Sequence, residues 1–508
     1  MGSQRIAGNR VAWPVSCLGL VAFGVGVLGV VPSPAGAAGA IGAAKPAEVE
    51  LKLLAADGED HDLFGHSVAV WGDTALVGAR HAGGEPGAVY VFERDGDTWV
   101  ESAKLTPADP TDSDFFGFSV SLFGDTAVVG APGADWFPGA ENNGAVYVFV
   151  REGGVWSEQA KLVPSGATSY RFLGGGVSLW GDTVLAGAPL AFDNGSNSGA
   201  AFVWVRQGET WTEEAKILPQ EVGAGDLFGW VVSLWRDTAL VSASRDDDVE
   251  LDNGAAYVFE RSGGTWTQEA KLAAADPQGG LAFGESVSLV EDTAVIGAFG
   301  DDTQGSESGS AYVFTRTGNV WTQQAKLLPS DGSPGAEFGS SVAISSGAAL
   351  VGAPSDLDRG AAYRFVQQAG VWVEDEKLAA LDGESGDQFG IGVARNGATD
   401  LVGADLDDDN GEDAGAAWLF EPAPMEVSVA GSCPGDVTIT VSGAPPNSEV
   451  GVVAAANTNG FVKGGVLCTG TVVEIGEPFQ LPPLWIKVDG AGKPEKRPSE
   501  LTSSSRRW

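Results

Sequence analysis

The chain has 508 residues, enough for more than one domain and a large buried core. Hydrophobic residues make up 43% of it and 74 residues are glycines, which argues against a disordered chain and favours many short strands joined by tight turns. The formal net charge of −39 argues against nucleic acid and anionic membranes as partners, because a strongly negative surface repels both.

The first 40 residues have the segment order of a secretory signal peptide. Arg5 and Arg10 form a positive region, residues 15–31 are apolar, and the small residues at 35–40 fit a cleavage site. An uncleaved membrane anchor is the alternative. We expect a protein that is secreted or exposed at the cell surface. After signal cleavage we expect no transmembrane segment, because no other apolar run is long enough to cross a bilayer.

One sequence block recurs seven times between residues 48 and 421. The typical copy contains a Phe-Gly step, a short Gly-Asp-Thr turn, two apolar segments and a Trp-containing segment that ends in Ala-Lys-Leu. The step glycines are separated by 52, 57, 55, 55, 55 and 51 residues, and this regularity indicates a repeat architecture. The steps are Phe64-Gly65, Phe116-Gly117, Leu173-Gly174, Phe228-Gly229, Phe283-Gly284, Phe338-Gly339 and Phe389-Gly390.

Each block contains four candidate strands, which in the second block are residues 117–122, 126–131, 145–150 and 155–162. The middle two are almost continuously apolar, whereas a sheet with one exposed face requires alternation. Both faces of each sheet should therefore be covered. Four-stranded sheets stacked face to face around an axis, as in a β-propeller, meet this requirement.

The ends of the repeat array predict how the ring closes. The seventh block ends at Glu421 without its Trp-containing strand, while Val49–Leu53 matches a fourth strand that has no block of its own. We predict an all-β fold: a seven-bladed β-propeller over residues 45–421, in which this N-terminal strand completes the last blade, followed by a small β-sandwich-like domain.

The repeat resembles the FG-GAP repeat family of bacterial type, which includes the propeller of integrin α-subunits. The Phe-Gly steps carry the resemblance, together with Gly-Ala-Pro triplets at 130–132, 187–189 and 352–354. The fourth block departs furthest, with Ser242-Ala243-Ser244 at the triplet. The resemblance covers about residues 48–421 and implies a seven-bladed propeller with an adhesion-type role.

The repeat stops at a short proline-containing linker. Residues 425–489 include two candidate strands, 425–429 and 436–441, and we expect a small β domain there. Removal of the signal peptide takes away Cys17 and leaves Cys433 and Cys468, an even pair that predicts one disulfide in an exported chain. Residues 490–508 are polar and basic and are expected to form a disordered tail, with a truncated or frame-shifted end as the alternative.

Acidic residues gather in particular loops of the propeller. Residues 41–421 carry 20 basic and 60 acidic side chains. The loops after strands two and four emerge on one face, and they contain the acidic runs, such as 57–62, 109–114, 246–252 and 405–413. Loops on a rigid scaffold commonly carry function. The alternative is that these loops are acidic only because the whole protein is.

Calcium is the sharpest metal hypothesis. Asp405, Asp407, Asp409 and Asp413 surround Gly411 and offer the oxygen density that Ca²⁺ prefers. The calcium loops of the resembled family join strands one and two, and here that turn has shrunk to Gly-Asp-Thr in most blades, as at 72–74, which leaves no room for such a loop. The alternative for the four carboxylates is exposed turn aspartates.

The three histidines of the chain all lie in the first block. His61 and His81 fall on loops of the acidic face, where Asp60 or Asp62 could join them around a transition metal. The spacing matches no known ligand signature. Surface histidines without a metal are the alternative.

No motif for nucleophilic, phosphate-binding or zinc-dependent catalysis is present, and we do not predict an enzyme. Tryptophans recur in the fourth strands, where packing between blades is favoured over a carbohydrate-stacking ladder. The lysine of each Ala-Lys-Leu is interpreted as structural, because charge on an outermost strand discourages edge-to-edge association. The tryptophans are Trp99, Trp156, Trp211, Trp266, Trp321 and Trp372.

The sequence therefore favours a binding or adhesion propeller that recognises an extracellular protein or glycan through its acidic loop face. Two alternatives from other classes stay open. One is an extracellular enzyme acting on polysaccharide, which paired carboxylates at the central opening would favour. The other is a structural module of the cell envelope.

Overall fold

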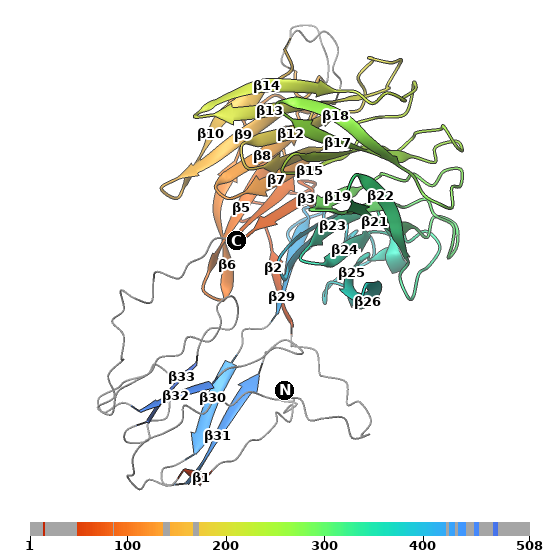
Figure 1. The fold of residues 1–508 in the computed structure, drawn as a ribbon. Coiled ribbons are helices and arrows are strands. Elements are labelled where there is room, and N and C mark those ends of the chain that lie inside the picture. Colours follow the sequence, from red (N-terminus) through yellow and green to blue (C-terminus); the bar gives the residue numbers. More distant parts are fainter. Residues whose placement is uncertain are drawn as a thin grey trace. The chain divides into compact units, whose positions relative to one another are not determined.

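The computed structural model describes residues 48–84, 86–135, 143–165 and 172–422, together with the backbone of strands at 14–15, 426–431, 435–442, 452–456 and 471–475. Seven four-stranded antiparallel sheets form a propeller, as predicted (Figure 1). The chain divides into a propeller unit, Glu50–Glu421, and a second unit made of Met1–Val49 and Pro422–Trp508. Within the described residues, no helix is long and apolar enough to span a membrane.

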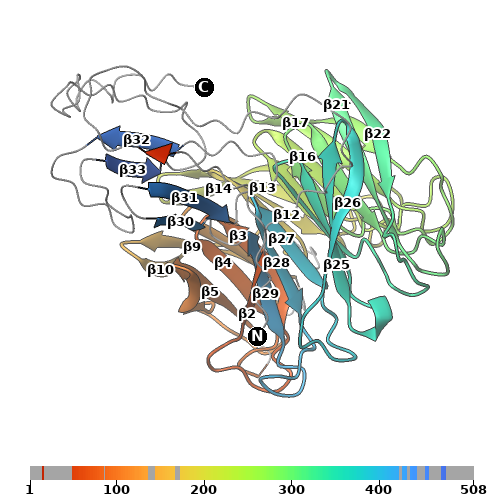
Figure 2. The same cartoon turned by 90° about the horizontal axis from the view of Figure 1, so that it is seen from below.

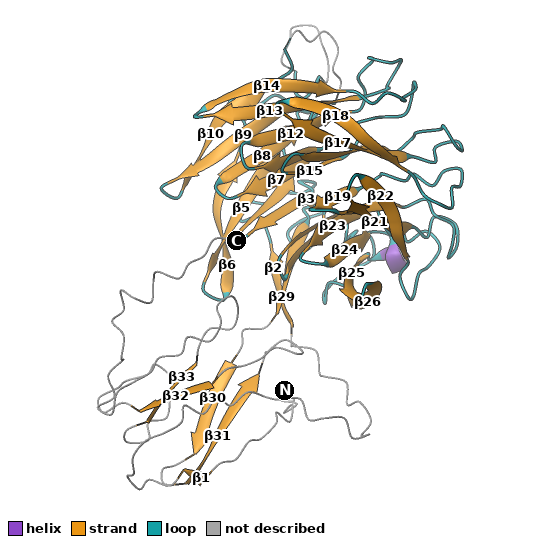
Figure 3. Cartoon of the chain, viewed as in Figure 1, coloured by secondary structure: helices purple, strands orange, loops and turns teal. Residues whose placement is uncertain are grey.

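Each blade runs from an inner first strand to an outer fourth strand. The blades are blade 1 (β3 Phe64–Trp71, β4 Thr74–Ala79, β5 Ala88–Asp95, β6 Thr98–Leu105), blade 2 (β7 Ser119–Phe123, β8 Thr126–Ala131, β9 Ala145–Glu152, β10 Val155–Leu162), blade 3 (β11 Val177–Trp180, β12 Thr183–Ala188, β13 Ala200–Gln207, β14 Thr210–Ile217), blade 4 (β15 Val232–Trp235, β16 Thr238–Ala243, β17 Ala255–Ser262, β18 Thr265–Leu272), blade 5 (β19 Val287–Val290, β20 Thr293–Ala298, β21 Ser310–Thr317, β22 Val320–Leu327), blade 6 (β23 Ser341–Ser345, β24 Ala348–Ala353, β25 Ala361–Gln368, β26 Val371–Leu378) and blade 7 (β27 Gly392–Asn396, β28 Thr399–Ala404, β29 Ala416–Pro422, β2 Glu48–Leu53). One 3₁₀ turn, η1 (Asp356–Asp358), interrupts a loop of blade 6 and is the purple segment of Figure 3.

The ring closes at blade 7 through the N-terminal strand, as the sequence predicted. β2 pairs with β29, so the first and last strands of the propeller lie in one sheet (Figure 2). The first strands contact one another in a closed cycle around the axis. Lys52 of β2 forms ion pairs with Asp382, Asp407 and Asp409 of the loops around blade 7.

Burial follows the apolar pattern. Nearly every residue of the second strands is buried, and so are the first five residues of each complete third strand. Seven apolar clusters lie at the interfaces between consecutive blades, and each draws side chains from both blades. The core of the propeller is therefore a set of seven interfaces, here called seams, and the sheets are sandwiched between them.

The Phe-Gly step is the element that lets two blades meet. Phe116 is fully buried, and Gly117 has a φ of +92°, a conformation that favours glycine. The backbone N–H of Phe116 donates to the carbonyl of Pro86 in blade 1. A Cβ placed on Gly78 of blade 1 would lie 2.2 Å from the carbonyl oxygen of Gly117. Two glycine-containing segments therefore touch across the seam at a distance that no side chain allows.

The fourth block departs from the repeat at two positions, and the two changes compensate each other. In blades 1, 2, 5 and 6 a serine lies two residues after the glycine of the Phe-Gly step. Its hydroxyl faces the glycine of strand two, as Ser67 faces Gly78. In blade 4 these two positions hold Val231 and Ser242. Ser242 is fully buried and its hydroxyl accepts the N–H of Val231, so the hydroxyl has moved from one strand to the other.

The second unit contains a three-stranded sheet, β1 (Pro14–Val15), β31 (Gly435–Ser442) and β30 (Glu426–Gly431), and a two-stranded sheet, β32 (Val452–Ala456) and β33 (Thr471–Ile475). β30 and β31 coincide with the two strands expected there. The predicted disulfide Cys433–Cys468, most of the predicted signal peptide and the basic tail 490–508 lie outside the described residues. The β-sandwich stays a prediction.

Removal of the closing strand should destabilise the whole ring. We expect deletion of residues 41–54 to lower the melting temperature by about 10 °C or more, because blade 7 then loses its outer strand and the Lys52 ion pairs. Circular dichroism measures the transition. Deletion of residues 41–47 alone is the control and should leave the melting temperature unchanged. An unaltered transition in the longer deletion would show that closure contributes nothing.

The glycine contact across the seam gives a second prediction. Gly130→Ala would place a Cβ 2.0 Å from the carbonyl oxygen of Gly174, and we expect a loss of about 3 kcal/mol in the free energy of unfolding. Gly124→Ala is the matched control, because Gly124 has a φ of +58° but no atom within 4 Å, and it should cost about 1 kcal/mol. Urea titration of both variants compares them. Equal losses would contradict the close contact as the cause.

Candidate functional site

The loops after strands two and four contact each other and form one face, here called the loop face. In blade 1, the N–H of His81 donates to the carbonyl of Asp62, and Gly133 and Asp114 make the same contact in blade 2. The Gly-Asp-Thr hairpins lie on the opposite, turn face. Each loop that enters a blade is also anchored from the outer strand, where a Glu or Gln side chain accepts a loop N–H, as Glu158 does from Ala108.

A lysine, an aromatic ring and an aspartate form a cluster that recurs on the loop face. In blade 2, Lys161 lies over the ring of Tyr147 at 5.0 Å and pairs with Asp109 at 2.8 Å, and the Tyr147 hydroxyl donates to the same carboxylate. Burial raises the pKa of Tyr147 above its ordinary value, so the phenol stays a neutral donor. The Ala-Lys-Leu lysines are thus structural, as expected, but through these pairs and not as free charges at an edge. The cluster lysines are Lys52, Lys104, Lys161, Lys216, Lys271, Lys326 and Lys377.

A second set of loop aspartates shapes the loops from inside. Asp62, Asp114, Asp226 and Asp387 precede the Phe-Gly steps by two residues, are buried, and each accept the backbone N–H of the residue three positions earlier. Burial raises the pKa of Asp62, and the N–H of Glu59 acts against it. Much of the acidity of this face therefore holds the loops in place, and negative charge alone does not mark a binding site.

The four aspartates of the predicted calcium loop are divided among three partners. Asp405 lies 2.9 Å from the Nδ1 of His66, Asp407 and Asp409 pair with Lys52, and Asp413 lies 3.1 Å from the Nδ1 of His61. Over the residues that the structure describes, no three His, Cys, Asp or Glu side chains are grouped so that they could hold a metal ion. Calcium binding here stays a prediction.

The three histidines of the first block have different neighbours. His61 and His66 face different aspartates, and His81 packs against the ring of Phe115 with a centroid distance of 5.4 Å. The structure brings His66 and Asp405 together, a pairing that sequence reasoning did not anticipate.

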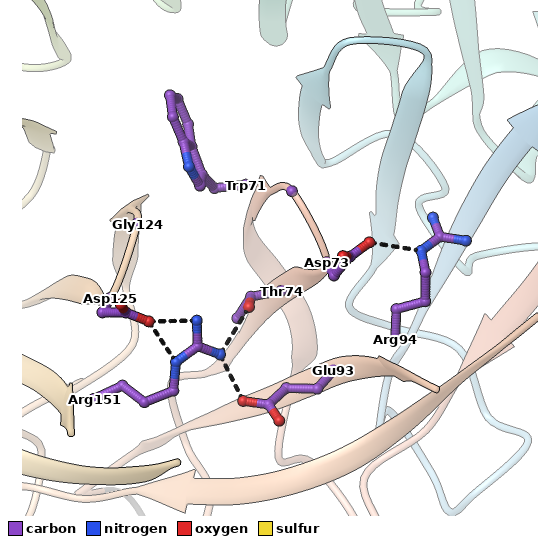
Figure 4. Close-up of a pocket in the computed structure, with 9 residues that line it drawn as sticks. Trp71, Asp73, Thr74, Glu93, Arg94, Gly124, Asp125 and Arg151 are labelled. Atoms are coloured by element: carbon purple, nitrogen blue, oxygen red, sulfur yellow. Dashed lines mark hydrogen bonds and ion pairs between the residues drawn. The ribbon is translucent and has the colours of Figure 1, made fainter. Parts of the chain in front are cut away.

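The turn face carries arginine bridges between neighbouring blades (Figure 4). Arg151 of blade 2 contacts Asp125 of its own hairpin and reaches Thr74 and Glu93 of blade 1, at 3.0 and 2.6 Å. Its guanidinium lies 5.2 Å from the ring of Trp156. A recess of about 350 Å³ opens here, and a second of about 720 Å³ lies beside Arg316. Because these recesses are lined by the paired groups of a recurring bridge, they are structural features.

The recurring tryptophans belong to the same bridges, which confirms their role in packing between blades. A β-bulge in the fourth strand adds one residue, and that residue reaches the next blade. Glu214 of blade 3 accepts from the indole of Trp266 in blade 4 and pairs with Arg261. In blade 1 the bulge residue is Ser102, which is too short, and the indole N–H of Trp156 has no partner.

The remaining feature lies on the loop face near the axis, where the innermost strands begin. Aromatic rings from successive blades contact one another: His66 and Phe118 at 5.1 Å, Phe118 and Phe172 at 5.3 Å, and Phe172 and Trp230 at 6.3 Å with nearly parallel planes. Glu285 of blade 5 follows them and hydrogen-bonds with Trp230. We call His66, Phe118, Phe172, Trp230 and Glu285 the axial arc; all five are half-buried.

Glu285 has an unusual environment for a carboxylate. Burial raises its pKa in spite of hydrogen bonds with Trp230 and Ser244, and the charge of Glu337 acts in the same direction as burial. Two carboxyl groups therefore interact electrostatically at the axial end of the loop face. Glu337 also accepts the hydroxyl of Ser355 at 3.0 Å.

Sequence reasoning missed the axial arc, although a signal for it exists. The position directly after each Phe-Gly step holds His66, Phe118, Gly175, Trp230, Glu285, Ser340 and Ile391 in blades 1 to 7. Neighbouring positions in the step repeat almost without change, so this one is not fixed by packing between blades. Comparison of the seven copies with one another would have found it.

The FG-GAP repeat profile matches seven segments of the chain, residues 48–92, 99–149, 156–204, 211–259, 266–314, 321–365 and 372–420. The chain belongs to the FG-GAP repeat family. These segments cover about two thirds of the chain, and the seven blades contain them. A search of curated protein sequences finds no significant match. The family fixes the fold of the propeller, and function has to be argued from the residues that differ between the blades.

Asp301, one of the buried aspartates of the loop-face clusters, gives a testable stability effect. Burial raises the pKa of Asp301. Hydrogen bonds from Lys326, Thr303 and Ser310 together lower it by more than burial raises it, so the pKa lies below the ordinary 3.8. We expect Lys326→Met to cost about 2 kcal/mol at pH 7, because the Asp301 side chain is only 1% exposed. Lys104→Met should cost less than about 1 kcal/mol, because its partner Asp57 is 60% exposed.

The pH dependence has a definite sign. A depressed carboxyl pKa stabilises the fold above the ordinary pKa of the group, and this stabilisation is lost as the pH falls through the folded value. The difference between wild type and Lys326→Met should therefore shrink below about pH 4, as urea titration across pH would measure. A difference that is constant down to pH 2 would contradict the ion pair as its origin.

Proposed function

We propose that this chain is an exported binding protein that recognises an extracellular protein or glycan through its loop face, with the axial arc as the centre of the site. The supporting observation is the contrast between positions. Residues that hold the blades together recur in most copies, whereas the position after the Phe-Gly step supplies Phe118 and Trp230 in two blades and Glu285 in a third.

The chemistry of the arc fits recognition. Half-buried aromatic rings provide flat apolar area at low entropic cost, and their faces suit both sugar rings and apolar protein side chains. Glu285 adds a hydrogen-bonding group next to the ring of Trp230. The loops that surround the arc are clamped by ion pairs and N–H anchors, as Lys161 and Glu158 show, so little order would have to be gained on binding.

The acidity of the propeller argues against a nucleic-acid partner more than it defines the site. The predicted signal peptide supports export, with the protein either secreted or at the cell surface. Protein partners would meet a loop face whose unpaired carboxylates favour basic surface through long-range attraction. Nucleic acid and membrane are not proposed as partners.

Array binding tests this proposal. Labelled chain from residue 41 to 508 is applied to glycan and extracellular-protein arrays, with and without calcium. We expect a ligand whose affinity falls at least tenfold in Phe172→Ala and in Trp230→Ala, which corresponds to about 1.4 kcal/mol. Val155→Ala is the control, because Val155 is 68% exposed at a hairpin of the turn face. Unchanged affinity in both arc variants would contradict the arc as the binding site.

One observation favours a second function, action on polysaccharide. Glu285, whose pKa is raised by burial, interacts with Glu337 at the axial end of the loop face, and glycoside hydrolysis uses pairs of carboxyl groups. Release of reducing ends from polysaccharides bound on the array, and its loss in Glu285→Gln, would support this function. Binding without turnover would support recognition alone.

A further inference from the structure

One seam of the ring differs chemically from the other six. At four positions around the interface of blades 6 and 7, charged residues replace the apolar residues found at the same positions of nearly every other blade: Arg364 and Glu376 in blade 6, and Arg395 and Asp400 in blade 7. At the seam of blades 5 and 6 the equivalent residues are Val313, Ala325, Ile344 and Ala349, which all belong to one apolar cluster.

The four charged residues form one buried network, here called the charged seam. The Nε of Arg364 donates to Asp400 at 2.7 Å, and its Nη1 donates to Glu376 at 2.9 Å. Arg395 binds the other oxygen of Asp400. Asp400 is fully buried and Arg364 is 6% exposed. One carboxylate is thus shared by two guanidinium groups that come from different blades.

Greater stability does not explain this arrangement. A buried ion network repays its desolvation only when every partner is present, and well-packed apolar residues of similar volume commonly stabilise a fold as well or better. The seam of blades 5 and 6 shows that this fold accepts apolar residues at all four positions. What the charges add is a difference between this seam and the others.

Such a difference matters in a ring of near-identical blades. If blade 6 docked on blade 1 and left blade 7 out, Arg364 and Glu376 would face Val70 and Ala75. If blade 7 docked on blade 5, Asp400 and Arg395 would face Val313 and Ala325. Each wrong pairing would bury an ion pair against apolar surface with half of its hydrogen bonds missing. Only the native pairing gives each of the four charged groups a partner of opposite charge, and it leaves the Nε of Arg395 without a hydrogen-bond partner.

We propose that the charged seam selects the partner of blade 6 during folding and thereby fixes the number and order of blades in the closed ring. The selected blade is the one that β2 completes from the other end of the chain, so a wrong choice at this seam also prevents correct closure. The charges act against competing arrangements of the same chain, which is how buried polar groups set register in other repetitive folds.

The test replaces the network with the apolar residues of the neighbouring seam, in the full chain from residue 41. Arg364→Val, Glu376→Ala, Arg395→Leu and Asp400→Ala are combined, and the protein is refolded from denaturant. We expect the native monomer to melt at or above the wild-type temperature. We also expect the fraction that refolds to monomer to fall at least twofold. Protease should cleave the misfolded fraction within residues 379–391, the loop that joins β26 of blade 6 to β27 of blade 7.

A charge-reversed variant is the matched control. Arg364→Glu, Glu376→Arg, Arg395→Asp and Asp400→Arg together keep the four groups complementary, and this variant should refold with a higher monomer yield than the apolar one. Refolding of the apolar variant with wild-type yield and protease pattern would overturn the proposal. A large fall in the melting temperature of its native monomer, or failure to fold at all, would also overturn it, because the charges would then serve stability.

Discussion

The propeller depends on a backbone contact that only glycine permits. Across six of the seven seams, the carbonyl of a Phe-Gly step lies against a glycine in the second strand of the preceding blade, at a distance that would put a Cβ of Gly130 2.0 Å from Gly174; the seam of blades 4 and 5 has Ser242 at this position. The contact lets the inner strands approach closely enough for seven short sheets to surround one axis. Apolar burial, the arginine bridges and the closing strand all act on blades already brought together by this contact.

Most of the recurring charged side chains in the propeller pair with each other. Lysines, arginines and aspartates recur at fixed positions and pair with each other, as in Lys161–Asp109 and Arg151–Asp125, so much of the acidity of the loops is structural. The residues with freedom to act on something else are those whose identity changes from blade to blade. In a repeat protein, variation among copies separates these two classes, because each packing position has been sampled seven times in one sequence.

The fold could be read from the sequence because its determinants are local and repeated. The Phe-Gly spacing gave the blades, and the unmatched Val49–Leu53 segment gave the closure, since a missing strand and a spare strand must pair. The structural role of the lysines is confirmed, but it rests on pairs with aspartates of loops that lie 52 residues away for Lys161 and 23 residues away for Lys216. The axial arc and the charged seam were missed because both arise where separate blades meet, and no window of a single block contains them.

The calcium hypothesis shows the same limit. A run of aspartates such as Asp405–Asp413 has the density of a cation site, but density says nothing of where each carboxylate points. In the folded ring, His66 and Lys52 approach that run from the far end of the propeller sequence. Partners that arrive through ring closure cannot be inferred from spacing along the chain.

The bulge in the outer strands of blades 1 to 6 gives the ring a direction. Glu214 reaches forward to Trp266 and Arg261, and Gln159 reaches forward to Trp211, so each of these blades supplies polar partners to its successor. The dependence is therefore vectorial: a change at one bulge is felt by the following blade, as Ser102 and the unpartnered indole of Trp156 show. The blades of such a ring are not interchangeable. A blade transplanted into the ring would have to match the polar bulge residue that the preceding blade supplies.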